Sequence, residues 1–131
     1  LSPKSLLAKA GMGTYRDLIV YQKAYQLTMD IFDRTKGFPS EEKFSLTLQI
    51  RKSSRSVCAN FVEAYRRRKY KPHFVSKLTD SLAENTETQL WLDISKDCKY
   101  IELHEYDDFA NRNEEVGRIL WYMIENPDKF M

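Results

Sequence analysis

The chain has 131 residues, enough for one domain with a hydrophobic core and too few for two. Only 4 Gly and 4 Pro punctuate it, and runs of alternating apolar and polar residues are scarce. A sheet needs turn residues every ~8–12 positions, so this composition favours long helices. No apolar run approaches the ~18 residues of a membrane span, and the N-terminus lacks the apolar core of a signal peptide. We therefore expect an all-α cytoplasmic protein.

The net charge of +2 conceals a strong polarity along the chain. Residues 1–79 carry 16 Lys and Arg against 6 Asp and Glu, whereas residues 80–131 carry 5 against 13. A basic half is typical of a nucleic-acid footprint. The two halves can equally attract each other, within or between subunits. We prefer this second interpretation because the acidic half has a helical pattern rather than that of a disordered tail.

The two cysteines, Cys58 and Cys98, lie on apolar faces of predicted helices. Neither belongs to a CxxC motif or has a histidine at metal-ligand spacing. We therefore expect both to be small buried hydrophobic residues in a reducing compartment.

The chain divides into an N-terminal arm and one helical domain. Residues 1–14 are interpreted as the arm, either flexible or an artificial extension ahead of Met12, and residues 15–131 as the domain. The first helix is predicted over residues 17–36, where apolar residues recur at i, i+3, i+4 and i+7. This stripe consists of Leu18, Tyr21, Tyr25, Thr28, Ile31 and Phe32.

The second helix is predicted over residues 41–68 and has three faces rather than the usual two. Gly37 is predicted to end the first helix in the left-handed C′ position, and Ser40 to cap the second. The apolar face carries Ile50, Ser54, Val57, Phe61, Ala64 and Tyr65. The polar face carries Gln49, Ser53, Ser56, Asn60 and Glu63, and the basic face carries Arg51, Arg55, Arg66 and Lys69. This helix is therefore expected to contribute to a core, a polar seam and a basic surface.

Two further helices complete the predicted fold. The third covers residues 72–100, with Pro72 at its first position, and the fourth covers residues 105–125. The core stripe of the third is Phe74, Val75, Leu78, Leu82, Asn85, Gln89 and Leu92; that of the fourth is Tyr106, Phe109, Asn113, Val116, Leu120 and Met123. Short connections between long amphipathic helices predict an antiparallel up-and-down four-helix bundle.

Four segments, taken in order, resemble a known bacterial family. Residues 15–24 read Tyr-Arg-Asp-Leu-Ile-Val-Tyr-Gln-Lys-Ala, and residues 49–53 read Gln-Ile-Arg-Lys-Ser. Residues 56–64 read Ser-Val-Cys-Ala-Asn-Phe-Val-Glu-Ala, and residues 80–90 read Asp-Ser-Leu-Ala-Glu-Asn-Thr-Glu-Thr-Gln-Leu. This series is similar to that of the four-helix-bundle proteins encoded in intervening sequences of large-subunit ribosomal RNA genes. Those proteins are related to the accessory proteins of diversity-generating retroelements.

The resemblance implies a four-helix bundle that assembles into a ring, typically a pentamer, with no established catalytic activity. Some relatives bind nucleic acid and a reverse transcriptase, so it also implies RNA or DNA, and a reverse transcriptase or another protein, as candidate partners. The chain departs from the family pattern at Cys58, Ala64 and Asp80, where Pro, Gly and Gly are usual. The last two departures bear on how closely the helices approach.

Eight basic residues form the candidate nucleic-acid-binding site. They are Arg51, Lys52, Arg55, Arg66, Arg67, Arg68, Lys69 and Lys71. Tyr65 and Tyr70 flank the Arg run and are candidates for stacking on unpaired bases. A solvated helix end, or salt bridges between subunits, would use the same residues without a ligand. If they bind phosphates, affinity is expected to follow charge rather than base sequence.

Eight polar residues on the second and third helices are interpreted as a buried structural seam that fixes helix register. They are Gln49, Ser53, Ser56, Asn60, Glu63, Ser81, Glu84 and Glu87. Buried carboxylates need hydrogen-bond partners, which Ser, Asn, Gln and Arg at matching spacing can supply. A carboxylate metal site is disfavoured because neither His73 nor His104 follows a Glu by three residues.

The sequence has no Gly-x-Ser-x-Gly, P-loop or Rossmann glycine pattern. We therefore predict a non-enzymatic homo-oligomeric bundle protein, a pentamer by resemblance, with no catalytic residues, cofactor or metal. In the leading hypothesis, its basic surface binds RNA or DNA as part of an accessory function. In the alternative, the protein is a structural or protein–protein interaction module that binds no nucleic acid.

Overall fold

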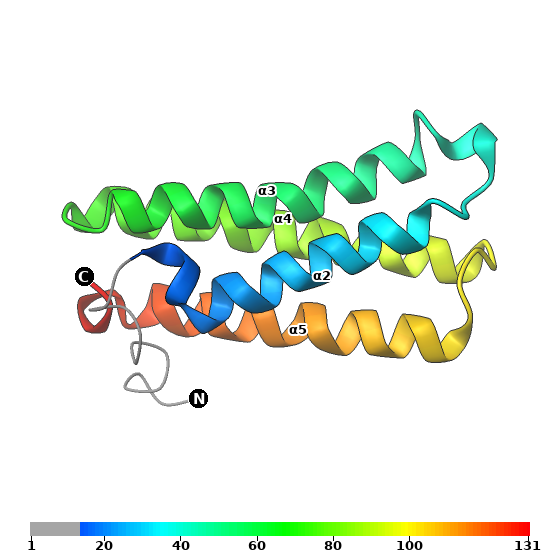
Figure 1. The fold of residues 1–131 in the computed structure, drawn as a ribbon. Helices are drawn as coiled ribbons and strands as arrows, with labels where there is room; N and C mark the ends of the chain where they lie inside the picture. Colours follow the sequence, from blue (N-terminus) through cyan, green and yellow to red (C-terminus); the bar gives the residue numbers. More distant parts are fainter. Residues whose placement is uncertain (1–13) are drawn as a thin grey trace.

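The computed structural model describes residues 14–131, which form four long helices joined by short connections (Figure 1). The helices are α2 (Ile19–Thr35), α3 (Leu46–Arg66), α4 (Lys71–Asp97) and α5 (Leu103–Glu125). Single 3₁₀ turns lie at Tyr15–Asp17, Ser40–Glu42 and Pro127–Lys129. Apart from Thr14, the predicted arm over residues 1–14 lies outside the described residues.

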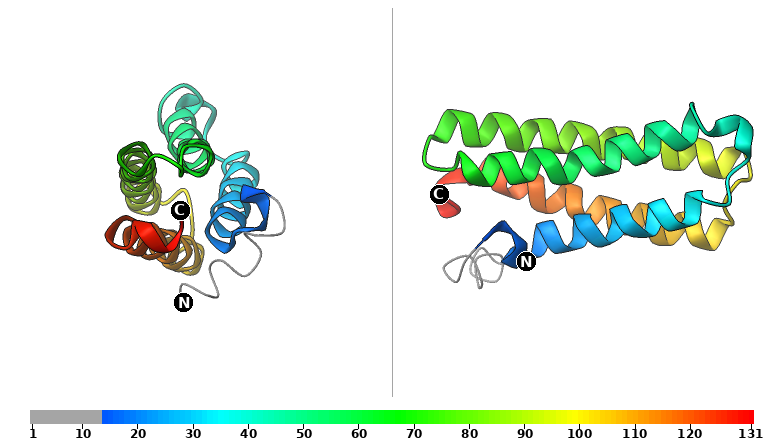
Figure 2. Two further views of the ribbon diagram at one scale, coloured as in Figure 1. Left: turned by 90° about the vertical axis from the view of Figure 1, so that its left-hand side faces the viewer. Right: turned by 45° about the horizontal axis from the view of Figure 1, so that its top comes forward.

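The helices run alternately up and down, which confirms the predicted antiparallel four-helix bundle (Figures 1 and 2). α3 packs against α2 on one side and α4 on the other, and α5 closes the bundle against α4 and α2. The interior contains two clusters of buried apolar side chains. One includes Phe61, Phe74, Leu78 and Leu120, and the other includes Ile31, Ile50, Leu92 and Phe109.

Hydrophobic periodicity located most of the core correctly. On the predicted apolar face of α3, Tyr65 is half-buried and the other five residues are buried: Ile50, Ser54, Val57, Phe61 and Ala64. The prediction for α2 was correct for half of its stripe, because Leu18, Thr28 and Ile31 are buried. Tyr21 and Phe32 are half-buried, and the side chain of Tyr25 is 48% exposed. Tyr25 lies at the edge of the stripe, on the side where α2 meets α3 at the surface.

The start of α3 differs from the prediction. Ser40 belongs to a 3₁₀ turn, and the α-helix begins only at Leu46. The Glu42 carboxylate accepts hydrogen bonds from Ser45 Oγ at 2.6 Å and from the Leu46 amide at 3.3 Å. Glu42 therefore supplies the acceptor for the first turn of α3 that Ser40 was predicted to supply.

Lys99, rather than Gly37, adopts the left-handed conformation predicted at a helix end. Lys99 has φ 62°, whereas neither glycine in the described part of the chain has a positive φ. The amides of Lys99 and Tyr100 donate to the carbonyls of Lys96 and Ser95, both at 2.9 Å, which is the Schellman pattern. Because α4 ends before this turn, Cys98 is exposed rather than buried as predicted.

Replacing Lys99 with Gly is expected to stabilise the protein. Glycine adopts φ 62° without the Cβ clash that lysine has there, so the free energy of unfolding should rise by about 0.5–1 kcal/mol. Urea denaturation followed by circular dichroism measures this change. Lys36→Gly is the matched control, because Lys36 caps α2 with an ordinary φ of −58° and should lose stability when replaced. Equal destabilisation by both changes would contradict the prediction.

Candidate nucleic-acid interface

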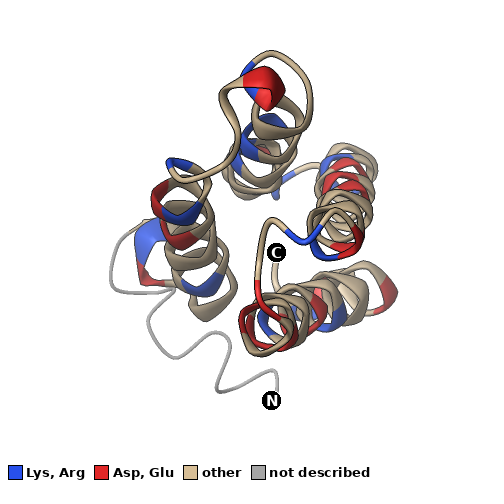
Figure 3. Ribbon diagram, turned by 90° about the vertical axis from the view of Figure 1, so that its right-hand side faces the viewer, with Lys and Arg blue, Asp and Glu red and all other residues tan. Residues whose placement is uncertain are grey.

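The predicted basic residues form two groups along α3. Arg51, Lys52 and Arg55 lie in the N-terminal half of the helix, and the other five, residues 66–69 and Lys71, surround the α3–α4 turn. A separation of 15 residues places Arg51 and Arg66 about 22 Å apart along the helix axis. On α4 and α5, by contrast, Lys and Arg are interspersed with Asp and Glu (Figure 3).

Arg51 in the first group has a structural role. Its Nε donates to Thr35 Oγ1 at 2.9 Å, and its Nη2 donates to the Phe32 carbonyl at 3.2 Å. The guanidinium also lies over the Phe32 ring, 4.6 Å from its centroid. Arg51 thus attaches α3 to the C-terminal end of α2. Arg55 is exposed and contacts the same ring at 5.6 Å, so it is the freer of the two to meet a phosphate.

The α3–α4 turn contains cations with and without partners. Arg68 donates to the Tyr65 carbonyl at 2.8 Å and lies 3.9 Å from the centroid of the Tyr65 ring. Lys71 pairs with Asp128 at 3.2 Å. A further three, Arg66, Arg67 and Lys69, are exposed and form no ion pair with any described residue. These three form the least neutralised part of the predicted site.

Within the predicted polar seam, Ser53 and Ser81 are buried between α3 and α4. Thr88 Oγ1 donates to Ser53 Oγ at 2.8 Å, and Ser81 Oγ donates to the Val57 carbonyl at 2.7 Å. Gln49, Ser56, Glu84 and Glu87 are half-buried at the margins. Burial, followed by repulsion from Glu87, raises the pKa of Glu84.

The expectation that Glu63 is buried was wrong. Its side chain is 52% exposed and pairs with Lys77 at 2.8 Å. Asn60 is half-buried, but its amide donates to the Ser56 carbonyl of its own helix rather than to α4. The line of closest contact between α3 and α4 runs through Ser53, Val57 and Ser81. Glu63 lies beside that line, where its carboxylate keeps access to water.

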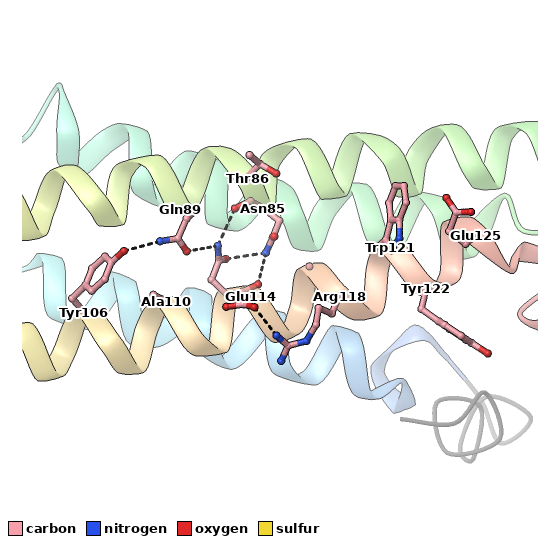
Figure 4. Close-up of a pocket in the computed structure, with 12 residues that line it drawn as sticks. Asn85, Thr86, Gln89, Tyr106, Ala110, Glu114, Arg118, Trp121, Tyr122 and Glu125 are labelled. Carbon is pink, nitrogen blue, oxygen red and sulfur yellow. Dashed lines mark hydrogen bonds and ion pairs between the residues drawn. The ribbon is translucent and has the colours of Figure 1, made fainter.

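A second polar network, between α4 and α5, was not predicted (Figure 4). Asn85 Nδ2 donates to Asn113 Oδ1 at 2.9 Å, and Asn113 Nδ2 donates back to the Asn85 carbonyl at 3.0 Å. Gln89 Nε2 donates to the Tyr106 hydroxyl at 3.2 Å, and that hydroxyl donates to the Asp93 carboxylate at 2.6 Å. This bond raises the pKa of Tyr106 to about 12. The sequence offered one signal for it, which is the position of Asn85, Gln89 and Asn113 on predicted core stripes.

This network forms the floor of a groove of about 750 Å³ between α4 and α5. Gly117 allows the close helix approach, because a Cβ atom there would lie 2.6 Å from Asn85 Oδ1. The rim carries the Glu114–Arg118 ion pair and the 55% exposed Trp121. In the described part of the chain, no three His, Cys, Asp or Glu side chains are placed to hold a metal ion.

Ion pairs within the chain join its basic and acidic halves. Lys23 pairs with Glu115 at 3.0 Å, and Arg34 pairs with Glu105 at 2.6 Å. The Arg34 guanidinium lowers the pKa of Glu105, and its Nη2 also donates to the Tyr100 carbonyl at 2.9 Å. These ion pairs therefore neutralise part of the opposite charge of the two halves within one chain.

None of the described helices is long and apolar enough to cross a membrane.

A family model described as the 23S rRNA-intervening sequence protein matches residues 16–122, most of the bundle. The chain belongs to this family. A search of curated proteins found no match. Among solved structures, the chain is similar to a Bacteroides thetaiotaomicron protein described as one of unknown function from the S23 ribosomal protein family. The two are 29% identical with a TM-score of 0.75, and the match covers 82% of this chain and 96% of the relative.

Removing an amide from the Asn85–Asn113 pair is expected to destabilise the bundle. Asn113→Leu leaves the buried Asn85 amide without its side-chain partner, which should lower the free energy of unfolding by about 1–3 kcal/mol. Glu63→Ala removes a carboxylate on the exposed surface, where water screens its ion pair, and should change the free energy of unfolding less than Asn113→Leu does. Thermal unfolding of the two variants beside the wild type gives the comparison. If Glu63→Ala proved the more destabilising, it would be wrong to describe the Asn85–Asn113 pair as a buried stabilising contact and Glu63 as a surface residue.

Proposed function

We propose that this member of the intervening-sequence family is a non-enzymatic accessory protein that binds RNA or DNA through the basic surface of α3 and the α3–α4 turn. One observation carries the proposal: Arg66, Arg67 and Lys69 form no ion pair with any described residue. Lys23 and Arg34 have carboxylate partners, whereas exposed cations elsewhere, such as Lys52, also form no ion pair with a described residue. The turn differs in that three such cations lie together. Unpaired cations clustered at a helix end repel one another, and phosphate oxygens would relieve that repulsion.

The expected mode of binding is electrostatic. Arg and Lys side chains on a convex helix surface contact phosphates and carry little information about base sequence. Such contacts are individually weak and depend on salt, since their free energy comes largely from counterion release. Several copies of the surface in one assembly would strengthen binding through multivalency.

We propose further that the protein is a closed homo-oligomer, with a pentamer favoured by the family resemblance. Large apolar side chains stay exposed after the bundle closes, including Phe44 at 80%, Trp121 at 55% and Leu90 at 49%. Such surface is commonly covered by another subunit. The α4–α5 groove beside Trp121 also supports the second candidate function, a protein–protein interaction module whose partner is another copy, a reverse transcriptase or another protein.

Light scattering is expected to give a mass that is a multiple of the 15.5 kDa chain at micromolar concentration. The exposed apolar residues provide the reason, because leaving them in water is unfavourable. A mass of 15.5 kDa would contradict the homo-oligomer.

Replacing Arg66, Arg67 and Arg68 with Ala is expected to weaken binding to unrelated RNA and DNA sequences alike. On duplex nucleic acid, the slope of log affinity against log salt should become shallower by about 0.9 for each phosphate that the variant no longer neutralises. Fluorescence anisotropy at several salt concentrations measures the slope. Arg118→Ala is the matched control, because Arg118 is 66% exposed on α5 and pairs with Glu114. Equal affinity of the triple variant and the wild type would favour the interaction-module alternative.

A further inference from the structure

Five aromatic side chains line the surface where α2 meets α3 and connect the two basic groups of α3. We call Tyr15, Tyr21, Tyr25, Phe32 and Tyr65 the aromatic ladder. The centroids of Tyr15 and Tyr21 are 5.0 Å apart, those of Tyr21 and Tyr25 5.7 Å, and those of Tyr15 and Tyr65 6.4 Å. The helices α2 and α3 run antiparallel (Figure 1). Tyr65 therefore lies at the Tyr15 end of the ladder and Arg51 at the Phe32 end.

Helical spacing places the α2 members of the ladder on one side of the helix. Tyr21, Tyr25 and Phe32 are separated by four and seven residues, so they share one side of the helix, with the 42% exposed Met29 between the last two. From Tyr21 to Phe32 the ladder extends about 16 Å along the axis. This length suits several nucleotides of an extended strand better than a small molecule.

Cations accompany the ladder at both ends. Arg16 lies 4.7 Å from the Tyr15 centroid and Arg68 lies 3.9 Å from that of Tyr65. At the other end, Arg51, Arg55 and Lys36 lie 4.6, 5.6 and 5.0 Å from the Phe32 centroid. The combination of ring faces and guanidinium planes is the one that proteins use to stack unpaired bases and hold their phosphates.

Three nearby carboxylates have cationic partners and oppose an anion only weakly, whereas Asp17 accepts from the Thr14 amide at 3.2 Å and has no cationic partner among the described residues. Asp30 accepts from Arg112 of α5 at 2.6 Å, and Asp33 pairs with Lys36 at 3.5 Å. Glu63 pairs with Lys77 on α4. The surface around the ladder therefore has a positive charge balance.

Packing of the hydrophobic core requires only some residues of the aromatic ladder. Tyr15, Tyr21 and Tyr65 pack against the larger core cluster, so they also have a structural role. Tyr25 and Phe32 belong to neither core cluster, and Tyr25 is 48% exposed. Tyr25 is therefore the member whose ring is available to a ligand and whose loss the fold should tolerate.

We infer that the aromatic ladder binds single-stranded nucleic acid, with a base stacked on Tyr25 and phosphates held by Arg16, Arg55 and Arg68. This inference rests on the proposed function and adds a strand preference to it. Bases in a duplex are already stacked and paired, so ring faces on the protein give them no added binding energy. A surface that binds through charge alone is not expected to gain affinity for single strands from base stacking.

Fluorescence anisotropy with three probes of equal length tests the inference: a single-stranded oligouridylate, an RNA duplex and an abasic single strand. The wild type should bind oligouridylate at least about 5-fold more tightly than the abasic strand, as one base stack predicts. Tyr25→Ala should abolish that difference, and Tyr25→Phe should keep it because the ring remains. Leu103→Ala, at a 64% exposed apolar residue of α5 outside the ladder and the basic site, is the matched control and should keep the wild-type preference for oligouridylate.

The outcomes separate the two proposals. If the wild type binds none of the probes at low salt, the nucleic-acid function itself fails. If the wild type binds all three probes equally and Tyr25→Ala binds as well as the wild type, the inference that the ladder stacks bases is wrong. The proposal of electrostatic binding by the basic surface is then retained. If Tyr25→Ala changes the mass measured by light scattering, the ladder is a subunit contact, which also overturns the inference.

Discussion

The rest of the structure depends on α3 being held from two sides by small hydroxyl-bearing residues. Toward α2, Thr28 Oγ1 donates to the Ser54 carbonyl at 3.0 Å. Toward α4, Ser81 Oγ donates to the Val57 carbonyl at 2.7 Å. Short side chains let helix axes approach closely, and hydrogen bonds to backbone carbonyls satisfy groups that burial would otherwise leave unpaired. With both neighbours fixed in antiparallel register, only the third face of α3 stays at the surface.

That register brings together residues far apart in the sequence. It places Arg51 of α3 over Phe32 of α2, and Tyr65 beside Tyr15, so that the basic face of α3 and the aromatic residues of α2 form one surface. A sliding of α2 by one helical turn would separate these pairs while leaving much of the apolar core in contact. Hydrogen bonds from Arg51 to Thr35 and to the Phe32 carbonyl oppose such sliding, because they need specific partners. The same residues thus fix the fold and shape the candidate interface.

Hydrophobic periodicity was sufficient to predict the four helices and most of the core, since burial on one side of a helix leaves a repeat in the sequence. Periodicity did not predict the cap of α3, which was expected at Ser40, or the left-handed residue Lys99. Caps and left-handed turns depend on hydrogen bonds that several residue types can make. Periodicity misplaced Glu63 because a polar stripe beside a core has the same pattern whether it is buried or wet. The ladder and the Asn85–Asn113 pair escaped prediction for another reason. Each joins two helices, so recognising them requires knowing the register between those helices.

Ultraviolet cross-linking of the protein to uniformly labelled single-stranded RNA, with the cross-linked peptides identified by mass spectrometry, tests the central claim most directly. Short-range photochemical attachment reports which side chains touch bases, independently of affinity. Cross-links concentrated in residues 15–32 of the α2 side and at Tyr65 of α3 are predicted. Cross-links confined to the α4–α5 groove, or to the α3–α4 turn without Tyr25, would contradict the account.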